Sequence, residues 1–344
     1  MGGAPLAGAR VRRAAPVVAS ARRVWRAALA ASLAASLAAS LALAGVAALA
    51  HPLAAQRTHL LLVTGLGGER RFSDAFAKQG AELYALAGTQ WRVADSSRIW
   101  LAEDPTRDPT RISGRSTREA VGNAFLALSK RVGPGDLLVV ILIGHGSGEG
   151  AASRVNLPGA DPTAADYAAW LSGFAKQTVV FVNAASASGD FVGVLKAPGR
   201  VVVTATRTAF ERNESIFGGA FVRGLSSAEA DADKDGRTTV MEAFSFAARE
   251  VARAYDQDQR MLTEHAVVSD SALAARTAFA AATASGDPRV VALVAERRVL
   301  EDSVAALRGR KATLPAAAYE AELERLLVAI AEKSAEIRAA GAKP

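Results

Sequence analysis

The amino-acid sequence predicts an α/β fold: an open, mostly parallel sheet with helices on both faces, followed by a C-terminal helical hairpin. Three observations support this prediction. Residues 59–65, 137–143 and 178–183 are apolar runs without polar alternation, which is typical of parallel strands buried on both faces. Segments of helical length separate most of the strands, at the spacing of right-handed crossover connections. After residue 272 the composition shifts to Ala, Glu, Arg and Leu, as in long helices.

The predicted elements follow one another along the chain as strands and helices. The expected strands cover residues 59–65, about 99–101, 137–143, 178–183 and 200–205, with 261–270 as a last strand with polar ends. The expected helices cover residues 73–87, 117–131, 164–174, 215–225 and 241–255. Because ligands of open parallel sheets bind at the carboxyl ends of the strands, we expect functional residues there.

The C-terminal part is predicted to be a hairpin of two helices. Pro288 stands just inside the start of the first helix, and the second runs from 316 to about 339 after a break at 311–315. Apolar residues at helical spacing are expected to form one stripe on each helix: Leu293, Val294, Val299, Leu300, Val304 and Leu307, and then Leu323, Leu326, Leu327, Ile330 and Ile337. The stripes can pack on each other, on the sheet domain, or on a second chain, so self-association is an alternative to packing within one chain.

The first 55 residues have the order of a targeting segment. Six arginines precede an uncharged Ala/Leu/Ser run over 27–50, which predicts a secretory signal cleaved after Ala50 or Ala55. A retained membrane anchor is the alternative, since the run is long enough to span a bilayer. Either way we expect the rest of the chain to be secreted or periplasmic, or anchored with its domains facing away from the cytoplasm. The predicted domains are 1–55, 56–275 and 285–340.

The charge distribution argues against a polyanionic partner. The formal net charge is +7, yet six of the 41 basic residues lie in the targeting segment. The rest of the chain has 35 basic and 34 acidic residues. The folded part is therefore nearly neutral, which predicts no nucleic-acid partner and a membrane contact only through an uncleaved N-terminal segment. The chain has no cysteine, so neither a disulfide nor a thiol nucleophile is available.

A histidine among glycines follows the apolar run at 137–143. His145 lies in the sequence Gly-His-Gly-Ser-Gly over residues 144–148, at a predicted strand end. A general base is suited to this position, because the imidazole titrates near neutral pH and the sheet opens to solvent there. The alternative is a turn histidine, with the glycines serving only the backbone conformation.

The next long apolar run, 178–183, ends in the small-residue turn Asn-Ala-Ala-Ser-Ala-Ser-Gly over 183–189. This pair of strand ends resembles that of the caspase, legumain and gingipain peptidases, in which His-Gly ends one strand and Ala-Cys-x-Ser-Gly ends the next. The resemblance covers roughly residues 57–275 and implies a caspase-like fold. The resemblance places His145 at the position of the family's general base and Ser186 at the position of its nucleophilic cysteine. It places Gly146 at the position whose backbone amide faces the oxyanion.

The serine at position 186 leaves two functions open. A thiol is partly ionised near neutral pH, whereas a serine hydroxyl needs a well-oriented base, and no motif provides a carboxylate to orient His145. The first hypothesis is a catalytically inactive peptidase-fold module that binds peptide or protein. The second is an exported peptidase or other hydrolase that uses Ser186 with His145 as base.

An acidic loop follows the fifth predicted strand. Residues 231–242 match the twelve-residue calcium loop, with carboxylates at positions 1, 3 and 5, glycine at 6 and glutamate at 12. The pattern predicts a structural Ca²⁺ held by Asp231, Asp233, Asp235, Arg237, Thr239 and Glu242. The alternative is an Asp/Gly turn that caps the following helix.

His265 lies in the predicted last strand. A single histidine beside a strand is most often a hydrogen-bonded edge residue, so we do not assign it a catalytic role.

Overall fold

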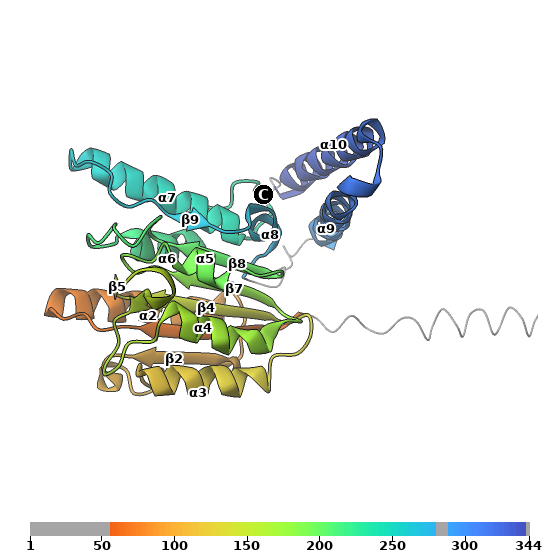
Figure 1. Ribbon diagram of the computed structural model, residues 1–344. Helices are drawn as coiled ribbons and strands as arrows, with labels where there is room; N and C mark the ends of the chain where they lie inside the picture. Colours follow the sequence, from red (N-terminus) through yellow and green to blue (C-terminus); the bar gives the residue numbers. More distant parts are fainter. Residues whose placement is uncertain (1–55, 280–287, 342–344) are drawn as a thin grey trace, which may run out of the picture. The chain divides into compact units, whose positions relative to one another are not determined.

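Figure 1 shows the computed structural model, which describes residues 56–279 and 288–341. The chain has the predicted α/β fold, with a seven-stranded, mostly parallel sheet and a helical C-terminal region. The predicted signal or anchor, residues 1–55, lies outside the described residues. None of the described helices combines the length and apolar character needed to cross a bilayer.

The strand order shows a sheet that grows in two directions from its first strand. Across the sheet the strands are β3 (Gly114–Arg115), β2 (Arg98–Ala102), β1 (Thr58–Thr64), β4 (Leu137–Ile143), β7 (Thr178–Asn183), β8 (Arg200–Thr204) and β9 (Val267–Val268). Only β9 runs antiparallel to its neighbour among these strands. The order reverses between β1 and β4, which is the place where open α/β sheets bind ligands.

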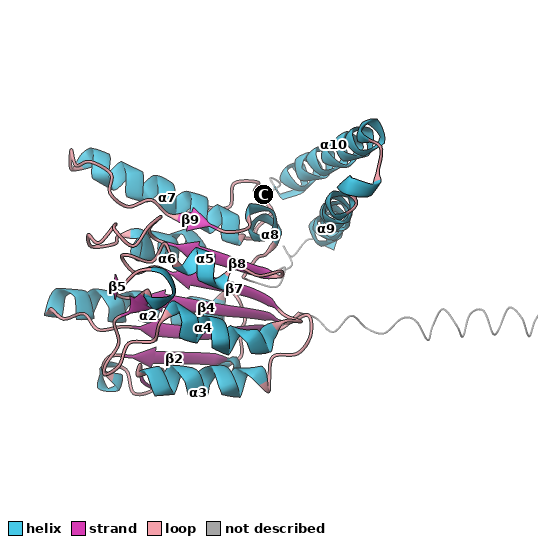
Figure 2. Ribbon diagram, viewed as in Figure 1, coloured by secondary structure: helices cyan, strands magenta, loops and turns pink. Residues whose placement is uncertain are grey.

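Alternating side chains of each strand face two separate cores. In β1, Leu60 and Leu62 lie in one core and Leu61 and Val63 in the other, and all four are fully buried. The first core is covered by α2 (Arg70–Thr89), α6 (Phe217–Ser226) and α7 (Val240–Gln257). The second is covered by α3 (Arg118–Ser129), α4 (Ala164–Leu171) and α5 (Phe191–Leu195). Helices therefore cover both faces, as Figure 2 shows.

The predicted last strand is largely wrong. Only Val267 and Val268 of residues 261–270 form a strand, which pairs with the end of β8. The preceding residues are tied to a loop instead: Asn213 Nδ2 donates to Thr263 Oγ1 at 2.9 Å, and Glu264 accepts hydrogen bonds at the start of α6. Side-chain contacts with a distant loop thus replace strand pairing.

Three two-residue strands were not expected, because two residues carry no periodic pattern. They are β3 at the sheet edge, and β5 (Gly146–Ser147) with β6 (Arg154–Val155), which form a small antiparallel pair directly after His145.

The C-terminal hairpin consists of α9 (Pro288–Gly309) and α10 (Ala316–Gly341). It has two small cores of its own, one around Leu293 and Ile337 and one around Leu307 and Leu326. The predicted stripes are wrong at two positions: Val299 and Leu327 are 65% and 46% exposed. Two helices that pack mainly on each other bury a narrower stripe than a helix that packs on a sheet.

Helix α2 lies close to the sheet because Gly80 has no side chain. A Cβ atom at this position would lie 2.5 Å from Cζ2 of Trp100, a fully buried residue of β2. The same helix carries two aromatic rings that contact His145. The close approach at Gly80 therefore helps to place part of the candidate site.

We expect Gly80→Ala to lower the free energy of unfolding by about 1–3 kcal/mol, because the added methyl overpacks the contact with Trp100. Urea denaturation monitored by circular dichroism measures the change. Gly193→Ala is the matched control, since Gly193 is helical, exposed and has open space around it. It should be neutral or raise stability by about 0.5–1 kcal/mol through helix propensity. Equal effects of the two substitutions would contradict the packing argument.

Candidate functional site

His145 and Ser186 follow neighbouring parallel strands of the sheet. β4 pairs with β7 over six residue positions, from Leu137 with Thr178 to Leu142 with Asn183. His145 comes two residues after the end of β4, and Ser186 comes three residues after the end of β7. The two turns thus lie at the same edge of the sheet, as the sequence predicts, next to the reversal of strand order.

The two turns touch through Gly146 and Ser186. The Gly146 amide donates a hydrogen bond to Ser186 Oγ, with a donor–acceptor distance of 3.3 Å. A Cβ atom on Gly146 would lie 2.3 Å from the Ser186 carbonyl oxygen, so only glycine permits this approach. Ser186 is 4% exposed. The hydroxyl is therefore buried against the Gly146 amide.

The His145 imidazole packs against aromatic rings of α2. Its ring lies edge-on to Phe72 and Phe76, with centroid distances of 4.6 and 5.1 Å. Within the described residues the imidazole makes no hydrogen bond, either to Ser186 or to a carboxylate. The sequence correctly predicts that His145 and Ser186 share one edge, but the side chains do not form a hydrogen-bonded pair.

A second histidine at this end of the molecule does have a carboxylate partner. His265 Nδ1 lies 3.0 Å from Glu211 Oε1, and the His265 amide donates to Glu211 Oε2 at 2.9 Å. The Glu211 carbonyl accepts a hydrogen bond from the Ala187 amide at 2.9 Å, which joins this pair to the turn that carries Ser186. The predicted role of His265, a hydrogen-bonded residue beside a strand, agrees with this geometry.

A small cavity adjoins His265. Its volume is about 180 Å³, and its lining includes Arg207, Phe217, Val251, Leu262 and His265. Buried Glu264 also lines it, and the carboxylate accepts from Ser215 Oγ and from the amides of Ile216 and Phe217. Burial raises the pKa of Glu264, and the three donors oppose that rise. Apolar and charged side chains both line the cavity, which is smaller than the roughly 300–1,000 Å³ of most ligand pockets.

The acidic loop gathers three of the six predicted metal ligands. Carboxylate oxygens of Asp231, Asp233 and Asp235 all lie within 4.8 Å of one another. Asp231 accepts from the amides of Gly236 and Asp235 at 2.9 and 3.1 Å, which closes the loop around its own backbone. Gly236 has a φ of +79°, a conformation that favours glycine. Three clustered carboxylates supply the hard oxygen donors that Ca²⁺ prefers.

Glu242 and Thr239 are engaged in a helix cap. Thr239 is the N-cap of α7, and its hydroxyl accepts from the Glu242 amide, while Glu242 Oε2 accepts from the Thr239 amide at 2.8 Å. The other oxygen, Oε1, accepts from the Ala232 amide at 2.9 Å. At Arg237, the amide donates to Asp235 Oδ1 at 2.8 Å. The loop is therefore an Asp/Gly turn that leads into α7, but Thr239 with Glu242 forms the cap, and not an aspartate of the turn as the alternative predicts.

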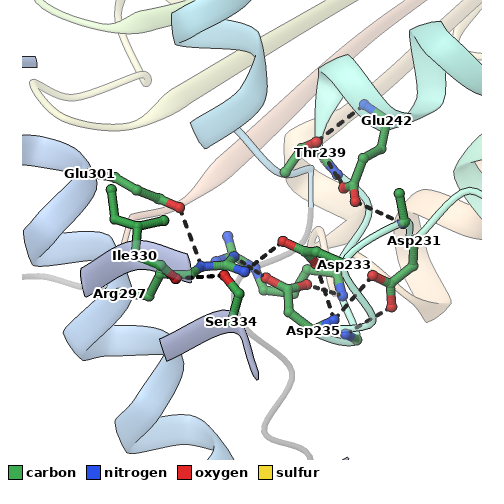
Figure 3. Close-up of polar contacts among 12 residues, drawn as sticks. Asp231, Asp233, Asp235, Thr239, Glu242, Arg297, Glu301, Ile330 and Ser334 are labelled. Atoms are coloured by element: carbon green, nitrogen blue, oxygen red, sulfur yellow. Dashed lines mark hydrogen bonds and ion pairs between the residues drawn. The ribbon is translucent and has the colours of Figure 1, made fainter. Parts of the chain in front are cut away.

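The acidic cluster already holds a cationic side chain. Arg297 of α9 places Nη1 2.5 Å from Asp233 Oδ2 and Nη2 2.5 Å from Asp235 Oδ2, as Figure 3 shows. Burial, with added repulsion from Asp233, raises the pKa of Asp235 to about 6 even with this cation present.

Sequence comparisons identify no relative. No protein-family model and no curated protein matches this chain. Among solved structures, protein GSU0716 from Geobacter sulfurreducens aligns over 65% of this chain and 99% of its own, with 14% sequence identity and a TM-score of 0.41. This similarity is too low to support any statement about function.

Sequence reasoning missed two residues of these sites, Glu211 and Arg297. Glu211 lies 54 residues before His265, and Arg297 lies 64 residues after Asp233. Both belong to segments where charged residues are frequent, so neither stands out in the sequence. Only the folded chain shows their partners.

We expect Ser186→Cys to give a thiol that reacts slowly with iodoacetamide, with a pKa at or above about 8.5. The site is buried, and no charged side chain of residues 56–279 or 288–341 pairs with Ser186. The wild-type chain has no cysteine, so the introduced thiol is the only one present. Alkylation rates as a function of pH measure the pKa, and Ser129→Cys provides an exposed control.

Adding His145→Ala to Ser186→Cys should leave the alkylation profile unchanged. A fast reaction at pH 6–7 that disappears with His145→Ala would instead show a thiolate–imidazolium pair and contradict the geometry described above.

Proposed function

We propose that this chain is an exported, catalytically inactive relative of the caspase and legumain peptidases, which binds peptide or protein at the edge formed by the His145 and Ser186 turns. The resemblance at the two strand ends, together with their adjacency across β4 and β7, supports the kinship. One observation carries the inactivity: Ser186 Oγ accepts from the Gly146 amide, while the His145 ring packs on Phe72 and Phe76.

This geometry opposes nucleophilic catalysis in two ways. A serine attacks only when a base removes its proton in the transition state, and no described base forms a hydrogen bond with Ser186. An oxyanion hole stabilises the intermediate only when its amides are free to donate to the substrate oxygen. Here the Gly146 amide donates to the hydroxyl itself, so neither part of the catalytic arrangement is available.

Exposed apolar side chains close to this edge support a binding role. Phe210 is 73% exposed and directly precedes Glu211, whose carbonyl holds the Ala187 amide of the Ser186 turn. Met261 is 84% exposed and lies on the loop that Asn213 and Thr263 tie to the Phe210 segment. Large exposed side chains near a cavity and a strand-end turn are typical of surfaces that contact a partner.

A fluorophosphonate probe tests for catalysis. We expect no covalent labelling of the wild-type chain, because none of the bases that the structure describes is hydrogen-bonded to Ser186. Labelling that is lost in both Ser186→Ala and His145→Ala would contradict the proposal and establish the alternative, a hydrolase that uses Ser186 with His145 as base. In-gel fluorescence measures the labelling, with an active serine hydrolase as the positive control.

A peptide array tests for binding. We expect retained peptides, and we expect Phe210→Ser to weaken their binding at least about tenfold, since an exposed aromatic anchor contributes more than about 1.4 kcal/mol at many interfaces. Leu126→Ser is the matched control. Leu126 is also exposed, at 58%, but it lies on α3, one of the helices that cover the core around Leu61 and Val63. Equal effects of the two substitutions, or no retained peptide, would count against a binding site here.

A further inference from the structure

The acidic loop and the C-terminal hairpin meet at one buried arginine. Arg297 lies on α9, its side chain is 7% exposed, and its guanidinium bridges Asp233 and Asp235. Its Nε atom lies 3.2 Å from Glu301 Oε1, one helical turn further along α9. Figure 3 shows the guanidinium reaching from the hairpin into the loop, with its two terminal nitrogens directed at the two carboxylates. A positive charge is therefore already held where the sequence pattern predicts a divalent cation.

The same oxygen atoms cannot serve both cations. Ca²⁺ binds six to eight oxygens at about 2.3–2.6 Å, so Asp233 and Asp235 would each have to turn an oxygen toward the ion. Oδ2 of each residue now lies 2.5 Å from an Arg297 nitrogen, and Oδ1 of each already accepts from a backbone amide of the loop, at 3.2 Å for Asp233 and 2.8 Å for Asp235. A guanidinium and a divalent ion on the same carboxylates would also repel each other at short range. The two cations therefore exclude one another.

The exposure of the two carboxylates provides a route for exchange. The Asp233 side chain is 38% exposed, whereas that of Asp235 is 2% exposed. An incoming ion can meet Asp233 first and reach Asp235 only as Arg297 leaves. The exchange replaces the single charge of the guanidinium with the double charge of Ca²⁺ beside three clustered carboxylates. The stronger attraction favours Ca²⁺ once the ion concentration is high enough.

The hairpin can leave the loop without losing its own structure. Its two cores, around Leu293 with Ile337 and around Leu307 with Leu326, are formed by α9, α10 and the connection between them. Against the preceding helix α8 (Ser271–Arg276) the packing is incomplete, since a cavity of about 390 Å³ lies there, lined by residues of α8, α9 and α10. An interface with such a cavity contributes less than a close-packed one, so the Arg297 ion pairs are an important tie.

We propose that Arg297, Asp233 and Asp235 form a latch that a divalent cation opens: Ca²⁺ takes the two carboxylates, displaces the guanidinium, and releases the hairpin from the acidic loop. This latch is independent of the proposed binding edge at His145 and Ser186. Ca²⁺ and Arg297 compete for the same carboxylates, and such coupling is reciprocal. Arg297 in the closed latch therefore lowers the affinity for Ca²⁺, and bound Ca²⁺ weakens the Arg297 contact by the same factor.

The test measures release and affinity in the full chain. Spin labels on Glu229→Cys and Val299→Cys, both at exposed positions, report the distance between the loop region and α9 by double electron–electron resonance. We expect CaCl₂ at about 1–10 mM, the range of weak extracellular sites, to lengthen and broaden that distance. A second pair within the hairpin, Val299→Cys with Leu327→Cys, should give an unchanged distance and so serves as the control.

Arg297→Met removes the competing cation while keeping much of the apolar stem. We expect this variant to show the long distance without calcium, and to bind Ca²⁺ at least about tenfold more tightly than the wild type in isothermal titration calorimetry. Arg297→Lys keeps the charge but loses the two-pronged contact, so we expect an intermediate affinity. Asp233→Asn should abolish the calcium response of the wild-type chain.

Three results would overturn the proposal. The first is Ca²⁺ binding with an unchanged loop-to-α9 distance. The second is equal Ca²⁺ affinity in the wild type and Arg297→Met, or in Arg297→Lys if the methionine variant does not fold by circular dichroism. The third is the absence of Ca²⁺ binding in all of these proteins. None of them bears on the fluorophosphonate or peptide experiments.

Discussion

Parallel pairing of β4 with β7 is the constraint on which the candidate site depends. Both strands are buried on both faces, so a one-residue shift of register would exchange the two cores and is strongly disfavoured. With the register set, the chain leaves both strands at the same edge. The contact between Gly146 and Ser186 follows, since a glycine beside this edge allows the two turns to meet within hydrogen-bond distance.

Packing around this edge then decides the chemistry. Gly80 lets α2 approach the sheet, and α2 brings Phe72 and Phe76 against the His145 ring. The imidazole contacts these two rings and makes no hydrogen bond with any residue that the structure describes. The carboxylate–histidine pair at this end of the fold belongs to Glu211 and His265, which joins loops around the Ser186 turn instead of activating it. At this edge the Ser186 hydroxyl accepts from the Gly146 amide, while the His145 ring packs on Phe72 and Phe76.

In the acidic loop the dominant interaction is the repulsion among the carboxylates of Asp231, Asp233 and Asp235. Three carboxylates within 4.8 Å need a cation, and burial makes the need greater for Asp235. Arg297 meets that need from within the chain and thereby joins the hairpin to the loop. The acidic cluster is thus a contact between two parts of the protein, the loop before α7 and the C-terminal hairpin.

The sequence by itself determined the elements whose signal is local. Strands β4 and β7 have the predicted bounds because long apolar runs have no alternative to burial. Tertiary structure decided what depends on contacts between distant segments. Thr263, Glu264 and His265 bond to residues 211–217 rather than to β8. Val299 and Leu327 face solvent, and Glu211 and Arg297 have partners more than 50 residues away. Such contacts leave no periodic pattern, because a charged side chain looks the same in sequence whether it meets water or a buried partner.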